Sequence, residues 1–213
     1  MNPNHFSILT IASLFLSTST TLLTAQSVNT SKPADKPRTE ARFFNQTTPF
    51  AGEITRGIIV AETNQFSFVV PPGFRRQFDA AAKKISLTST SYTCSITAIL
   101  HESAIEGKAD LKPDSVRQLL ISRYKNARVV DEFNASIESM SGPAFELEWP
   151  AESGLMSTRA AFVPYPGGHI EVTVQAPASE FRAYDQSLFQ LLMSFRTSPV
   201  GTKLAVQEYL SEL

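Results

Sequence analysis

Two histidines and a neighbouring carboxylate are the residues of this sequence best suited to chemistry. Of its three histidines, His101 and His169 lie in the part that is expected to fold. His169 and Glu171 are two residues apart on an expected strand, so both point to the same face. Imidazole and carboxylate are ligands that divalent transition metals accept. His169 and Glu171 are therefore the candidate metal ligands, with an acid of a neighbouring strand, Glu146 or Glu148, as a further donor.

A structural role explains the same pattern more simply. The alternation along the expected strands also places both histidines on the more polar face, where surface histidines are common. We therefore favour a chain that has no metal ion and no cofactor. Alternation places three acids and one arginine on the same polar face. They predict a solvent-exposed ladder of cross-strand ion pairs, made of Glu146, Glu148, Arg159 and Glu171.

Nucleophilic catalysis has no recognisable motif in the chain. The sequence contains no Gly-x-Ser-x-Gly, the turn that presents the serine of many hydrolases. Cys94 is the one cysteine, which excludes an intramolecular disulfide. It alternates with polar residues between Tyr92 and Leu100, which predicts a buried structural thiol. Whether the chain is an enzyme stays open, and we favour a non-catalytic role.

Charge gives little reason to expect a polyanionic partner. The 19 Lys and Arg residues nearly balance the 20 Asp and Glu residues, and the formal net charge is −1. No block of basic residues is present that could follow a phosphate backbone or an anionic bilayer. We therefore expect no nucleic-acid partner.

The first residues are typical of an export signal. An apolar stretch diluted by Ser and Thr runs from Phe6 to Leu23 and is followed by small residues around Ala25. This pattern predicts a signal peptide over 1–25, although no Lys or Arg precedes the apolar stretch. An uncleaved anchor is the alternative, but the Ser and Thr content makes a poor membrane span. We expect a periplasmic or extracellular protein without integral membrane association once the signal is removed.

Composition divides the rest of the chain. Residues 26–49 are mostly polar and predict a flexible linker, residues 50–197 a single domain, and residues 198–213 a tail that can include a short helix. Phe43 and Phe44 stand out within the linker. They either dock onto a partner or fold back over the edge of the domain.

The pattern of strands and helices predicts an α+β domain, an antiparallel sheet flanked by helices. A strand at Phe66–Val70 ends at Pro71-Pro72-Gly73, and an amphipathic helix is expected from Pro113 to Asn126. A second helix is expected from Ser179 to Phe195. The remaining strands are expected at 85–88, 92–101, 128–133, 136–140, 144–149, 156–163 and 169–176, with turns at 141–143, 152–154 and 166–168.

Two short segments resemble a known family. The segment Phe66–Phe74 is similar to the opening strand and Pro-Gly-aromatic turn of the family that includes the photosystem protein PsbP and the Ran-binding Mog proteins, and Leu191–Arg196 is similar to the close of its last helix. The resemblance implies an α/β/α sandwich. It also implies a mostly non-enzymatic family of accessory or assembly factors that bind proteins, and it transfers no functional residue.

Two functional hypotheses follow. The first is an exported, non-catalytic accessory or binding protein that acts through a protein partner. The alternative is a small-molecule or metal-binding protein, or an unrecognised hydrolase, whose pocket lies between the sheet and a helix. A cluster of His101 or His169 with a hydroxyl or an acid in such a pocket would favour the alternative.

Overall fold

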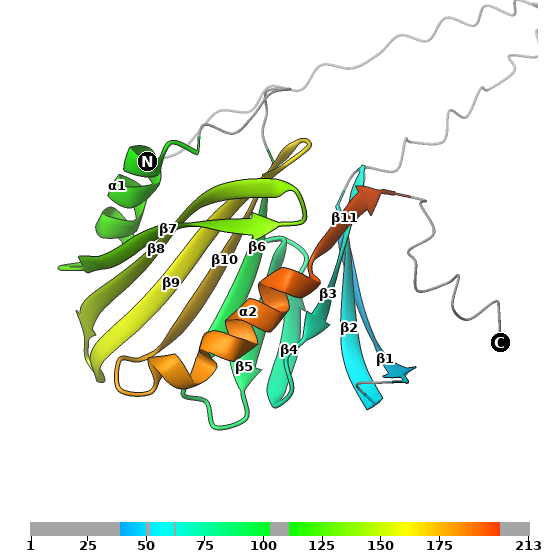
Figure 1. Ribbon diagram of the computed structural model, residues 1–213, viewed down its shortest axis with the longest axis horizontal. Helices are drawn as coiled ribbons and strands as arrows, with labels where there is room; N and C mark the ends of the chain where they lie inside the picture. The colour runs from blue at the N-terminus through cyan, green and yellow to red at the C-terminus, as the bar shows by residue number, and fades with distance from the viewer. Residues whose placement is uncertain (1–38, 50–51, 62, 103–110, 201–213) are drawn as a thin grey trace, which may run out of the picture. The chain divides into compact units, whose positions relative to one another are not determined.

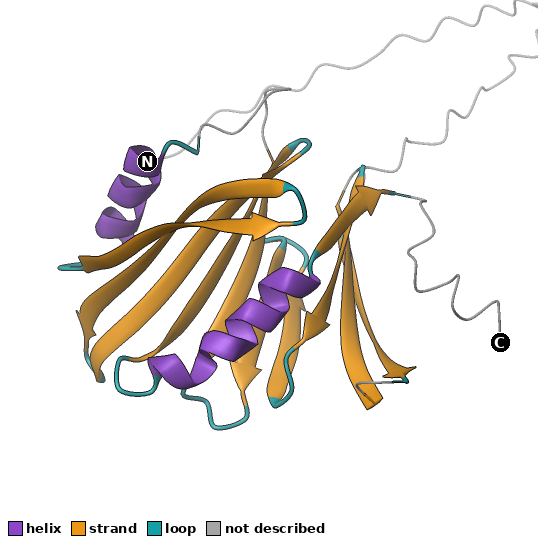
Figure 2. Ribbon diagram, viewed as in Figure 1, coloured by secondary structure: helices purple, strands orange, loops and turns teal. Residues whose placement is uncertain are grey.

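A computed structural model describes residues 39–49, 52–61, 63–102 and 111–200 (Figure 1). All of them belong to one compact unit, 35–213. Strands dominate this part of the chain, and they form two antiparallel sheets accompanied by two short α-helices (Figure 2). None of the described helices is long and apolar enough to cross a membrane.

The smaller sheet has four strands in the order β1-β2-β3-β11. Its last strand comes from the end of the described chain, so the sheet joins segments far apart in sequence. The strands are β1 (Glu40–Thr48), β2 (Gly52–Ala61), β3 (Asn64–Val70) and β11 (Arg196–Pro199).

The larger sheet has seven strands in the order β4-β5-β6-β10-β9-β8-β7. A helix, α1 (Pro113–Arg123), lies in sequence between β6 and the edge strand β7, and the 3-10 helix η1 (Phe181–Tyr184) and α2 (Asp185–Ser194) follow the central strand β10. The strands are β4 (Phe74–Asp79), β5 (Lys84–Ser89), β6 (Ser95–Glu102), β7 (Arg128–Ile137), β8 (Met140–Ala151), β9 (Gly154–Tyr165) and β10 (Gly168–Pro177).

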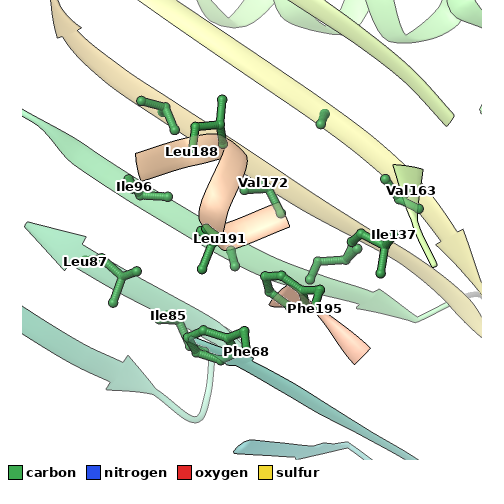
Figure 3. Close-up of a cluster of buried hydrophobic side chains, with 14 of the residues drawn as sticks. Phe68, Ile85, Leu87, Ile96, Ile137, Val163, Val172, Leu188, Leu191 and Phe195 are labelled. Carbon is green, nitrogen blue, oxygen red and sulfur yellow. The ribbon is translucent and has the colours of Figure 1, made fainter. Parts of the chain in front are cut away.

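The main hydrophobic core lies between one face of the seven-stranded sheet, one face of the four-stranded sheet and α2 (Figure 3). Helical spacing puts Leu188, Leu191 and Phe195 on the buried side of α2 and its C-terminal end. The ring of Phe195 stacks on that of Phe68 from β3, with ring centroids 5.1 Å apart. The space beneath α2 is therefore filled by apolar side chains.

A second core covers the opposite face of the seven-stranded sheet. Val116 and Leu120 of α1 are buried there against Phe145 and Leu147 of β8. Pro113 begins the helix, where its missing N–H costs nothing, and Asp114 lies in the first turn, where the helix dipole favours an acid. Both faces of the sheet thus have a helix, and the predicted α+β class and the predicted start of α1 are confirmed.

The predicted linker is wrong at its C-terminal end. Residues Glu40–Thr48 form β1, which pairs with β2 along its whole length. Alternation turns Ala41 and Phe43 towards the main core, and Phe43 meets Phe68 edge to face. Phe43 therefore folds back onto the domain, whereas residues 26–38 of the predicted linker lie outside the described ones, as does the predicted signal peptide.

Other boundaries also differ from expectation. The predicted turn at 141–143 lies inside β8, because Gly142 leaves room for the carbonyl oxygen of Phe162 on β9, to which an added Cβ would come within 1.8 Å. The strand β4 was not predicted, and β11 extends the domain to Pro199. The turn at 152–154 is confirmed between β8 and β9. The predicted helix within the tail lies outside the described residues.

Candidate functional site

His101 and His169 meet across the centre of the seven-stranded sheet. They are directly opposed residues of β6 and β10, and their rings stack 4.5 Å apart at an interplanar angle of 11°. The close approach of the strands depends on Gly168, whose added Cβ would lie 1.9 Å from the carbonyl oxygen of His101. The strand pairing thus brings together the two histidines that the sequence singled out.

Glu171 lies beside this pair, on the same face of β10, and its side chain is only 2% exposed. Nε2 of His101 is 3.3 Å from Oε2 of Glu171, but the two are not aligned as a hydrogen bond. Both oxygens of Glu171 instead accept from the guanidinium of Arg123 at the end of α1, and Nη2 of Arg123 lies 3.2 Å from Oε2. Thr173 donates to Oε1 at 3.2 Å. The carboxylate is therefore held by the helix that covers it.

The electrostatics of this cluster favour a neutral histidine and an ionised acid. Burial would raise the pKa of Glu171, but His101 and Arg123 outweigh it and lower the pKa to about 2. Burial, followed by the nearby His101, lowers the pKa of His169 to about 4, although Glu171 acts in the opposite direction. At neutral pH the cluster is thus a charge-balanced pair of Glu171 and Arg123 with an uncharged His169 beside it.

The predicted metal ligands His169 and Glu171 do lie together, and His101 joins them. Among the residues that the structure describes, no group of three or more His, Cys, Asp or Glu side chains is placed to hold a metal ion. Glu146 lies on the opposite face of the sheet. It is two residues from Ala144 on β8 and so shares the face of Ala144, which belongs to the main core. A metal at Glu171 would have to displace Arg123, so the arrangement is better suited to fastening α1 than to chelation.

The predicted ladder is correct in its Glu146–Arg159 pair but wrong in its solvent exposure and in its inclusion of Glu171. Glu171 and Glu146 belong to opposite faces, and both are buried because a helix covers each face. Glu146 accepts from Arg159 at 2.6 Å, as the ladder predicted, and also from Arg182 of η1 at 2.7 Å. Glu148 is the acid of the ladder that has a solvent-exposed ion pair, at 2.7 Å with Arg128, whose side chain is 74% exposed.

Arg159 was predicted as a partner of these acids, but Arg123 and Arg182 were not. Arg123 is 48 residues from Glu171, and Arg182 is 36 residues from Glu146. One signal was present: an acid on a strand beneath an amphipathic helix is buried and needs a cation, which that helix can supply. Which helix covers which acid could be deduced only once the pairing of the strands was known.

Cys94 is confirmed as a buried thiol. It is 1% exposed within the main core, and burial raises the pKa of its thiol to about 12. The thiolate that reacts or binds a metal is therefore strongly disfavoured.

The four-stranded sheet has two unlike faces. Its inner face carries Ile59, Phe66 and Phe68 and belongs to the main core. Alternation sends the other residues of each strand to the opposite side, which we call the outer face. Neither described helix packs there, since α2 joins the main core and α1 joins the second core (Figure 2). The apolar residues of the outer face are half-buried, and they are Phe44, Ile54, Ile58, Val60 and Val69.

Comparison with known proteins places the fold. No family model and no curated protein sequence matches the chain. Among solved structures, LpqN of Mycobacterium tuberculosis, described as involved in cell envelope biogenesis, matches with a TM-score of 0.51 and 14% identity over 75% of this chain and 92% of LpqN. The cyanobacterial PsbP protein of Synechocystis matches with a TM-score of 0.51 and 9% identity over 80% and 99%.

A third similar structure is the Ran-binding protein Mog1p of Saccharomyces cerevisiae, with a TM-score of 0.46 and 12% identity over 73% of this chain and 96% of Mog1p. The chain has the PsbP/Mog fold that its two short segments indicated. At these identities the likeness concerns the fold alone.

Proposed function

We propose that this chain is an exported, non-catalytic accessory protein that binds another protein through the outer face of its four-stranded sheet. The observation that carries the proposal is the row of half-buried apolar side chains on that face, with Ile58 near its centre. In most proteins such an apolar face is buried against another layer of secondary structure. An apolar face that is not covered in this way is often a protein-binding surface.

The polar clusters of the chain support the same proposal. The buried acids Glu171 and Glu146 are each paired with an arginine of a helical segment, Arg123 of α1 and Arg182 of η1. Such groups are engaged in holding the fold, whereas a catalytic acid has to reach a substrate. This use of the charges favours binding over the alternative of a hydrolase with a pocket beneath α2.

Export is the second part of the proposal. It rests on the apolar stretch from Phe6 to Leu23 and the small residues that follow it. The PsbP/Mog fold is compatible with it, since LpqN is described as involved in cell envelope biogenesis. The protein would then act in the periplasm or outside the cell.

The test compares two single variants in affinity recovery from an extract of the organism that encodes the protein. Ile58→Thr keeps a β-branched residue in β2 but removes apolar surface from the outer face. Phe189 on α2 is 63% exposed, so Phe189→Ser removes a larger and more exposed apolar side chain from another surface and serves as the control. We expect proteins that the wild type and Phe189→Ser recover equally and Ile58→Thr recovers at several-fold lower yield. Equal recovery by all three would contradict the proposal.

A further inference from the structure

The outer face carries an excess of positive charge. Alternation places three arginines there beside the apolar row, Arg42 from β1, Arg56 from β2 and Arg196 from β11. Among the described residues, Glu40 is the acid whose position on its strand also places it on the outer face. Its Oε2 lies 3.7 Å from Nη2 of Arg42, whose side chain is 82% exposed. Among the described residues, no acid forms an ion pair with Arg56 on the inner strand β2 or with Arg196 on the edge strand β11.

Arg56 and Arg196 are held in place by neutral groups. Nε of Arg56 donates to Oε1 of Gln46 at 3.0 Å, and Nη1 of Arg196 donates to the carbonyl oxygens of Met193 and Phe195 at 2.8 and 2.7 Å. Neither takes part in an ion pair among the described residues. Burial, followed by the charge of Arg196, lowers the pKa of Arg56. Two like charges thus lie on one face of the sheet, Arg56 half-buried and Arg196 exposed, with no carboxylate partner among the described residues.

This charge arrangement is unfavourable in the free protein. A partly desolvated guanidinium gains most from a carboxylate, which it can hold in bidentate geometry. The fold supplies such carboxylates to its other half-buried arginines, as Glu171 does for Arg123 and Glu146 for Arg159. For the half-buried Arg56 of the outer face, the described part of the chain offers no such carboxylate, and the requirement is left for a partner to meet.

Resting on the proposed function, we infer that the partner presents an acidic and apolar protein segment, whose carboxylates pair with Arg56 and Arg196 while its apolar side chains cover Ile58 and Val69. A second copy of this chain fits less well, because two such faces would bring like charges together. An anionic bilayer offers the charge but would favour a denser cationic surface than these few arginines.

The test measures peptide binding to the purified protein by fluorescence anisotropy. The probes are a labelled twelve-residue peptide in which Glu alternates with Val and a matched peptide in which Lys alternates with Val. We expect saturable binding of the Glu peptide that weakens with salt, and none of the Lys peptide. Arg56→Gln and Arg196→Gln should each weaken binding by about fivefold, whereas Arg128→Gln, a surface control on β7, should leave it unchanged.

Charge reversal gives the sharpest result. The double variant Arg56→Glu/Arg196→Glu should lose the Glu peptide and bind the Lys peptide instead. Equal binding of both peptides, no saturable binding of the Glu peptide, or binding that is unaffected by these substitutions would overturn the inference. So would dimerisation in sedimentation, or binding to phosphatidylglycerol vesicles, that depends on Arg56 and Arg196 while the Glu peptide does not bind. The proposed function fails separately, if Ile58→Thr recovers the same proteins as the wild type.

Discussion

Arg123, the last residue of α1, donates through both terminal nitrogens to the carboxylate of Glu171 on β10. This contact fastens the helix to the centre of the seven-stranded sheet. Arg123→Ala would leave the buried Glu171 without its guanidinium partner, and removal of one partner of a buried ion pair typically costs about 3–5 kcal/mol of unfolding free energy. Because the side chain of Arg123 is 36% exposed, water can partly replace it, and we expect the lower end of that range.

Urea unfolding measures this loss, and Arg128→Ala is the matched control. Arg128 pairs with Glu148 at the surface, where an ion pair contributes less than about 1 kcal/mol. A loss for Arg123→Ala no larger than that of the control would contradict the role of the contact. The double variant Arg123→Met/Glu171→Met should recover much of the stability, since it removes both charges.

Acid should destabilise the fold in two steps at this cluster. The pKa of His169 falls from its ordinary 6.5 to about 4 in the folded chain, so the unfolded chain binds a proton first. The stability from a neutral His169 is complete above pH 6.5 and is lost as the pH falls towards 4. The step is on the order of 1–3 kcal/mol.

The second step belongs to Glu171. Its pKa falls from 4.5 to about 2, so its contribution is complete above pH 4.5 and is lost as the pH falls towards 2. Urea midpoints between pH 7.5 and 4 should fall for the wild type and fall less for His169→Gln. Parallel curves for the two proteins over that interval would show that His169 does not titrate as described.

Glu146 should matter more than its neighbour Glu148. Glu146→Gln keeps the shape of the side chain but removes the charge that Arg159 and Arg182 share, and we expect a loss of about 2 kcal/mol. Glu148→Gln changes an exposed pair and should cost less than about 0.5 kcal/mol. Thermal unfolding of both variants checks this order, which equal melting temperatures would refute.

The two faces of α2 should respond differently to truncation. Phe195 is fully buried and stacks on Phe68, so Phe195→Ala should cost about 3–5 kcal/mol through the cavity that it leaves. Phe189 is 63% exposed, and Phe189→Ala should change stability by less than about 0.5 kcal/mol. Chemical denaturation separates the two outcomes, and similar losses would mean that the outer side of α2 is packed in solution.

The sequence predicted the elements whose pattern is local. The start of α1 at Pro113 and the turn at 152–154 depend on residues next to one another, and both were correct. The helix α2 was found too, although its first turn is the 3-10 helix η1. β1 was missed because its polar composition resembles a linker, and only pairing with β2 shows that Phe43 is an inward residue.

The sequence predicted which residues form the candidate site but not the structural role of Glu171 in holding α1. Parity correctly placed His101, His169 and Glu171 on one face of the sheet. It could not show that Glu146 belongs to the other face, since that depends on the register between β8 and β9. It also could not show Arg123 or the arginines of the outer face, because these contacts join segments that only the complete topology brings together.

The measurement that tests the central proposal most directly is site-specific photocrosslinking in the organism that encodes the protein. A benzoylphenylalanine at position 60 replaces Val60 on the outer face, and one at position 155 replaces Leu155, which is 53% exposed on β9 and serves as the control. The account predicts a discrete protein adduct from position 60 that is absent from position 155 and is lost when Arg56→Glu/Arg196→Glu is added. No adduct at position 60, or the same adducts at both positions, would contradict it.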